Sequence, residues 1–69
     1  MDLHKELKKA IDKQIKSGMT LYAISQWLST EKGSYFDPGY FTNMYRRLEK
    51  GGGLQSRQFE KLLKIYEII

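Results

Sequence analysis

Residues 37–51 read DPGYFTNMYRRLEKG, and this stretch carries signals for both the start and the end of a helix. Asp37 before Pro38 favours a helix start, because the carboxylate caps free amides and proline tolerates the first helical position. Apolar side chains recur at helical spacing within the stretch, at Phe41, Met44, Tyr45 and Leu48. Glycines at 51–53 end the pattern. The stretch therefore predicts a helix from about Pro38 to Glu49.

Two helices are predicted before this stretch. The first runs from about Asp2 to Ser17, because apolar residues recur along one side at Leu3, Leu7, Ala10, Ile11 and Ile15. Gly18 then occupies the position at which a left-handed residue ends a helix. Thr20 is suited to cap a second helix, from about Leu21 to Ser29, whose inner side chains are Leu21, Ile24, Trp27 and Leu28. Residues 29–36 have no periodicity and predict a loop.

A fourth helix is predicted after the glycines, from about Ser56 to Ile68. Its inner side chains are expected to be Phe59, Leu62, Leu63 and Tyr66. Three isoleucines widen its apolar arc beyond what one small core needs: Ile65, Ile68 and Ile69. No strand pattern competes with these helices. The expected fold is therefore all-α, a single small domain over residues 1–69 with four or so short helices.

The composition limits the functions that this chain can have. Its 69 residues include no cysteine and one histidine, and 12 Lys and Arg against 8 Asp and Glu give a charge of +4. No nucleophile-base pair and no Cys/His metal site can be assembled from these, so we expect no enzyme, metal or cofactor. A basic chain favours an acidic partner, most often nucleic acid. The lack of cysteine, of a long apolar run and of a signal-like start predicts a soluble cytoplasmic protein, with no membrane and no small-molecule substrate.

The outward face of the predicted 38–49 helix carries residue types that read DNA. Helical spacing places four polar side chains on this face, namely Asn43, Arg46, Arg47 and Lys50. Asparagine pairs with adenine, arginine pairs with guanine, and both basic residue types neutralise phosphates. Near the helix start, Tyr40 and Thr42 are expected to add contacts to the DNA backbone or to a thymine methyl group. The alternative is an ordinary solvated face, on which Arg46 and Arg47 only increase solubility.

The order of the elements resembles the helix-turn-helix of the Cro and lambda-repressor-like family, over residues 19–66. Thr20 and Ser25 match the small polar residue that opens the family's second helix and the small residue at its close helix contact. Residues 48–51 match the end of its third helix, and residues 55–63 match the polar start of its fourth. The resemblance implies sequence-specific binding of duplex DNA by a dimeric transcriptional repressor. By this resemblance we expect a repressor that belongs to a phage or plasmid and acts by occupying an operator.

The segment before the third helix departs from the family pattern. The family usually leaves only a few residues there, whereas residues 29–36 form a longer connection, so the docking angle of the third helix cannot be transferred. This loop is itself expected to reach DNA through Lys32, Ser34 and Tyr35. By the resemblance, contacts to the DNA backbone are also expected from Thr20, Tyr22 and Lys50.

The apolar end of the chain predicts a homodimer. Ile65, Ile68 and Ile69 would supply the self-complementary contact by which small helix-turn-helix proteins read two half-sites. The alternative is that these residues cover the end of the first helix within one monomer. Trp27 is expected in the core, because it lies in register with Ile24 and Leu28.

Two other functions remain open from the sequence. A protein-interaction module, of the antirepressor or inhibitor type, would dock through the apolar edge at residues 65–69 together with the region of Trp27. Binding of RNA or a single strand would use the tyrosines, but the chain lacks the aromatic-rich sheet on which such binding commonly depends.

Overall fold

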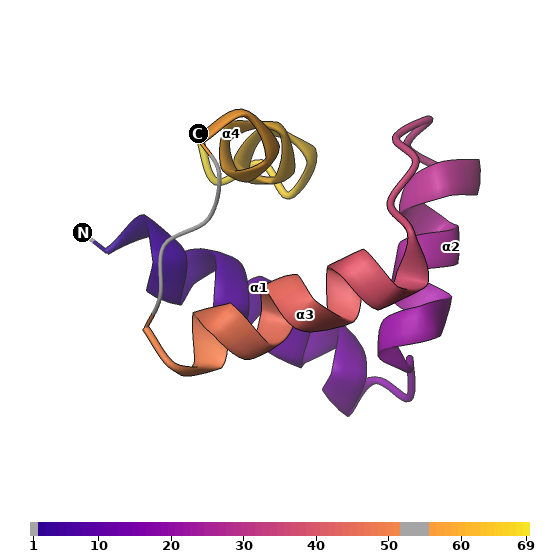
Figure 1. Cartoon of the computed structure of the whole chain (residues 1–69), viewed down its shortest axis with the longest axis horizontal. Helices are drawn as coiled ribbons and strands as arrows, with labels where there is room; N and C mark the ends of the chain where they lie inside the picture. Colours follow the sequence, from indigo (N-terminus) through magenta and orange to yellow (C-terminus); the bar gives the residue numbers. More distant parts are fainter. Residues whose placement is uncertain (1, 52–55) are drawn as a thin grey trace.

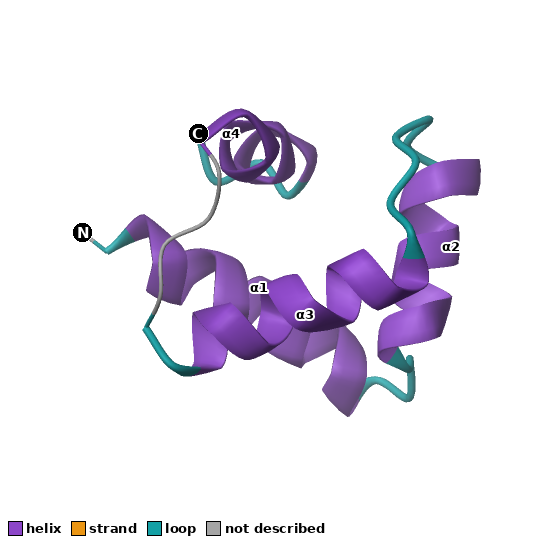
Figure 2. Cartoon of the chain, in the orientation of Figure 1, coloured by secondary structure: helices purple, strands orange, loops and turns teal. Residues whose placement is uncertain are grey.

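The described residues of the chain fold into short helices. Within residues 2–51 and 56–69, which the computed structural model describes, the backbone forms four α helices and no strand (Figures 1 and 2). These are α1 (Leu3–Lys16), α2 (Leu21–Thr30), α3 (Pro38–Glu49) and α4 (Ser56–Ile65). The all-α prediction is thus confirmed for this part of the chain. Residues 52–53 and 55, used above as helix-end and helix-start signals, lie outside the described residues.

Side-chain caps begin the first three helices. The Asp2 carboxylate accepts hydrogen bonds from the amides of His4 and Lys5 at the start of α1. The Thr20 hydroxyl oxygen accepts one from the Ala23 amide at 3.0 Å. The Asp37 carboxylate accepts two, from the first turn of α3. Such caps satisfy amides that have no partner within the helix, and each is worth about 1 kcal/mol.

The ends of α1 and α4 share one geometry, reached with different residues. After α1, the Met19 amide bonds to the Gln14 carbonyl at 3.1 Å, with Gly18 between them at φ +108°. After α4, the Ile68 amide bonds to the Leu63 carbonyl at 2.8 Å, with Glu67 at φ +58°. Both are left-handed helix ends, and a left-handed conformation is costly for any residue with a side chain.

The fourth helix is therefore shorter than predicted. It ends at Ile65, whereas the apolar pattern predicted an end near Ile68. The pattern continues past the true end because the left-handed turn folds Ile68 back against the core, where it stays partly buried. Without a glycine at position 67, the sequence carries no obvious stop signal at this point.

One apolar cluster holds the helices together. It contains the inward side chains Leu7, Ile11, Ile24, Leu28, Phe41, Met44, Leu48, Leu62 and Leu63. Phe36 joins them from the connection between α2 and α3, with a relative exposure of only 3%. Its ring contacts the Phe41 ring edge-on, with 6.1 Å between centroids. Phe36 thus anchors the loop to the core.

The helices pack so that α3 lies against both α1 and α2, and α4 lies against α1. In Figure 1, α2 stands at the end of the molecule far from both termini, and α4 is seen nearly end-on. The His4 ring stacks on the Phe59 ring at 4.2 Å, which joins the start of α1 to α4. The Tyr66 hydroxyl donates to Gln14 Oε1 at 2.5 Å, and burial raises the pKa of this tyrosine.

The left-handed helix ends predict opposite effects of glycine at two positions. Glu67→Gly relieves the backbone strain after α4, so we expect it to stabilise the protein by about 1 kcal/mol. Gly18→Ala introduces the same strain after α1 and should destabilise the protein by a similar amount. The added Cβ meets nothing within 4 Å, so backbone strain is the only cost expected. Thermal unfolding measures both, with shifts of about 4–8 °C per kcal/mol.

Glu67→Ala is the matched control for charge. It removes the carboxylate from the negative end of the helix dipole but leaves a side chain at positive φ. It should therefore be less stable than Glu67→Gly. Equal stability of the two variants would contradict a strained helix end.

Candidate nucleic-acid interface

The outward face of α3 is set by the side that this helix buries. Phe41, Met44 and Leu48 are buried in the core. The opposite side is exposed, and it carries the four predicted site residues Asn43, Arg46, Arg47 and Lys50. We call these four residues the α3 face. Three of them are cations, and Glu49 is the acidic residue within the same stretch. A polar, positively charged surface on an exposed helix is suited to the major groove.

A polar contact between α1 and α3 holds the orientation of this helix. The Tyr45 hydroxyl of α3 donates a short hydrogen bond to Asp12 Oδ1 of α1. Lys8 Nζ binds the other oxygen of the same carboxylate at 2.7 Å and lies 5.6 Å from the centre of the Tyr45 ring. Neither the tyrosine nor the aspartate was singled out for this role from the sequence, because the contact joins residues 33 positions apart.

The charges in this contact support one another. Desolvation raises the pKa of Asp12, but the hydrogen bonds from Lys8 and Tyr45 outweigh it and hold the pKa of the carboxyl below its usual value. The bond to Asp12 is in turn the main reason why the pKa of Tyr45 is raised. The contact is therefore strongest with an ionised Asp12 and a protonated Tyr45.

The two residues predicted near the start of α3 differ in their exposure and in their hydrogen bonding. Tyr40 is 39% exposed, and its ring lies nearly parallel to that of Phe36, with 6.4 Å between centroids. Thr42 is partly buried and donates its hydroxyl proton to the Pro38 carbonyl at 2.9 Å. Tyr40 is thus placed to contact a partner, whereas the Thr42 hydroxyl proton is already used in a hydrogen bond within the helix.

The predicted residues at the start of α2 lie on the surface. Tyr22 is 61% exposed, in the first turn of the helix. Thr20 is exposed as well, and its hydroxyl oxygen caps the helix. The hydroxyl proton of Thr20 is not needed for that cap, since the oxygen acts there as an acceptor. Ser25, which the resemblance places at the close helix contact, is buried and donates to the Tyr22 carbonyl at 2.7 Å.

The loop at residues 31–37 holds the remaining predicted contacts (Figure 2). Tyr35 on this loop is 73% exposed. Ser34 is partly buried, and its amide bonds to the Leu28 carbonyl at 2.9 Å. Lys32 Nζ lies 5.4 Å from the centre of the Trp27 ring. Backbone bonding and Phe36 thus tie the loop to the domain, with Tyr35 directed outward.

The predicted dimer edge is mostly packed within the monomer. Ile65 and Ile68 are partly buried against the core cluster. Ile69 is 61% exposed. Trp27 also packs against the core, with its ring 5.7 Å from that of Tyr66. The apolar surface that remains at this end of the chain is small.

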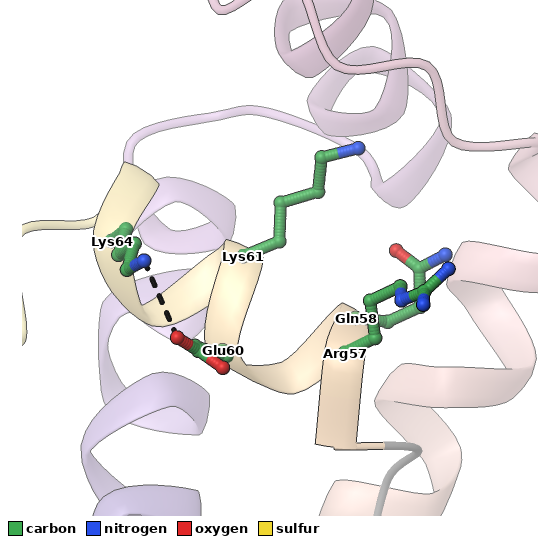
Figure 3. A pocket seen from close by; sticks show the side chains of 5 residues that line it. All are labelled: Arg57, Gln58, Glu60, Lys61 and Lys64. Atoms are coloured by element: carbon green, nitrogen blue, oxygen red, sulfur yellow. Dashed lines mark ion pairs between the residues drawn. The ribbon is translucent and has the colours of Figure 1, made fainter.

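Two cations of α4 were missed by the sequence reasoning. Arg57 and Lys61 lie four residues apart on the exposed side of this helix. Their side chains and that of Gln58 leave α4 toward the ribbons of α3 and the loop, and Lys61 Nζ lies 6.0 Å from the centre of the Phe36 ring (Figure 3). The signal in the sequence is their spacing of four residues, which places both cations on one side of a helix.

Comparisons with protein-family models, with curated proteins and with solved structures find no match to this chain. No helix in the described ranges combines the length and the apolar character needed to cross a membrane.

The Asp12 contact predicts a pH-dependent stability. Because its pKa is lower in the folded chain than the ordinary 3.8, this carboxyl stabilises the fold above that pH and loses its effect as the pH falls below it. Asp12→Asn should therefore be less stable than the parent at about pH 6. The difference in free energy of unfolding between the two should become smaller below about pH 3. Urea unfolding at several pH values measures this.

Glu60→Gln is the matched control, because Glu60 lies in an exposed pair with Lys64 at 3.3 Å and receives no hydrogen bond from a tyrosine. At pH 6 the free energy of unfolding of Glu60→Gln should differ from that of the parent by less than that of Asp12→Asn does. A gap for Asp12→Asn that stays constant from pH 6 to pH 2 would contradict the role given to the carboxylate.

Proposed function

We propose that this protein binds duplex DNA in a sequence-specific manner, with α3 lying in the major groove. The observation that carries the proposal is the α3 face: Asn43, Arg46, Arg47 and Lys50 share the exposed side of one helix. The opposite side of that helix is buried in the core. The helix is therefore held by packing while its polar side stays free for a partner.

The chemistry of the α3 face matches the edges of DNA bases. The asparagine amide can donate and accept hydrogen bonds with adenine, and each guanidinium can donate two to guanine. A good bidentate pair is worth about 1–3 kcal/mol of discrimination against a wrong base. Lys50, at the end of the helix, is placed for phosphate, and so is the exposed side chain of Tyr22, whereas the Tyr35 hydroxyl lies 3.5 Å from Asp37 Oδ1.

The size of the domain limits how much DNA one chain can cover. The longest extent of the chain is 28 Å. Half-sites of helix-turn-helix dimers lie about 34 Å apart, so one chain covers one half-site. A homodimer would read an inverted repeat. Among the three isoleucines its contact would rest mainly on Ile69, because Ile65 and Ile68 pack against the core. Such a protein would act as a transcriptional repressor of a phage or plasmid by occupying an operator.

The rival function is the protein-interaction module. It needs an apolar docking surface at residues 65–69, but Ile65 and Ile68 already pack against the core. The exposed apolar residue there is Ile69, whereas the α3 face offers three cations on one helix. The balance of exposed surface therefore favours nucleic acid over an apolar protein partner.

The double variant Arg46→Ala/Arg47→Ala tests the proposal. Both side chains are exposed, so the fold should keep its thermal stability. Loss of base and phosphate contacts should weaken binding of a labelled duplex by about tenfold or more. Fluorescence anisotropy at fixed salt measures the affinity.

The matched control is Lys13→Ala/Lys16→Ala, which removes the same charge from the exposed side of α1, opposite Leu7 and Ile11. We expect this variant to bind almost as the parent does. An equal loss of duplex affinity in both double variants would show that net charge alone causes the effect. A parent protein that binds no duplex would refute the proposal outright.

A further inference from the structure

The exposed side of α4 carries its own row of cations. Arg57, Lys61 and Lys64 lie on this side together with Glu60, around a shallow surface hollow of about 280 Å³ (Figure 3). Glu60 pairs with Lys64 at 3.3 Å. Arg57 and Lys61 take part in none of the ion pairs found among the described residues. Their charges are therefore available to a partner.

Lys61 lies near the first turn of α3, and Arg57 lies four residues before Lys61 on the same exposed side of α4. Lys61 Nζ sits 6.0 Å from the centre of the Phe36 ring, and the Phe36 ring is stacked on that of Tyr40, with 6.4 Å between centroids. Tyr40 is the partly exposed tyrosine in the first turn of α3. A continuous path of contacts thus connects α4 to the recognition helix. In Figure 3, Arg57 extends from α4 on the same side as Lys61.

We propose that Arg57 and Lys61 form a second contact to the duplex, binding backbone phosphates next to the groove that α3 occupies. This inference rests on the proposed function, and it adds the element that positions the helix on DNA. Each DNA strand carries one phosphate per about 3.4 Å of helix axis, and phosphates flank both sides of a major groove about 12 Å wide. A helix in the groove therefore brings phosphates close to its neighbouring elements.

The chemistry of the two residues suits phosphate and not bases. Neither residue lies on α3, so both can contact the DNA backbone beside the groove while that helix is inside it. Arginine binds phosphate with two parallel hydrogen bonds, and lysine binds it as a point charge. Phosphate contacts fix the register of a protein on DNA without reading sequence. Arg57 and Lys61 should thus contribute affinity that is equal for all duplex sequences.

The salt dependence of binding tests this inference. Each phosphate contact contributes about 0.9 to the slope of log affinity against log salt concentration. Arg57→Gln/Lys61→Gln keeps much of both aliphatic stems and should lower the slope by about 1.8. Between 50 and 200 mM salt, the parent should then lose about tenfold more affinity than this variant. Lys13→Gln/Lys16→Gln, with the same change in charge on α1, should keep the parent slope.

The outcomes separate this inference from the proposed function. If the parent binds duplex DNA and Arg46→Ala/Arg47→Ala weakens it, an unchanged slope in the α4 variant overturns the second contact alone. A parent that binds no duplex overturns both. A variant that weakens RNA binding but leaves duplex DNA binding unchanged also overturns the inference, because the cations would then serve another nucleic acid.

Single substitutions guard against a folding defect. Lys61→Gln alone removes the cation above Phe36, and Arg57→Gln alone leaves that contact intact. Each should lower the slope by about 0.9. Lys61→Arg keeps the charge and should retain the parent slope. A slope that falls for Lys61→Arg as far as for Lys61→Gln would show that shape, and not charge, causes the effect, and would overturn the inference.

Discussion

The burial of one side of α3 is the constraint on which the rest of the structure depends. Phe41, Met44 and Leu48 enter the same apolar cluster as the inward residues of the other helices. Full burial of such a side chain contributes about 1.5–3 kcal/mol, so this helix cannot rotate without exposing several of them. Its polar side therefore has one orientation, and the bond from Tyr45 to Asp12 secures it against α1. The α3 face is a consequence of the core.

Much of the fold could be predicted, because its signals are local. The caps at Thr20 and Asp37 and the left-handed Gly18 all lie at helix ends where the sequence places them. Two features could not be read in this way. Phe36 has no periodicity around it, and its burial depends on packing against the core and against the Phe41 ring of α3. Glu67 adopts a left-handed conformation that its residue type does not suggest, so the end of α4 was predicted too late.

In the candidate site, too, the features set by local spacing could be predicted and those set by tertiary packing could not. Exposure of the α3 face follows from helical spacing, because the buried positions of one helix determine the exposed ones. The approach of α4 to the loop before α3 does not follow from spacing within either helix. It arises where Lys61 passes over Phe36, a contact between two segments that only tertiary packing brings together. Ile65 and Ile68 pack back onto the core, which agrees with the alternative of packing within one monomer more than with a dimer edge.

The central claim is that a helix held by its core presents sequence-reading residues to duplex DNA. The most direct measurement is selection from a pool of random duplexes at about 150 mM salt, where non-specific phosphate attraction is weak, followed by sequencing of the bound fraction. The account predicts enrichment of one motif, arranged as an inverted repeat if two chains bind together. A folded protein that enriches no sequence above the starting pool would contradict it.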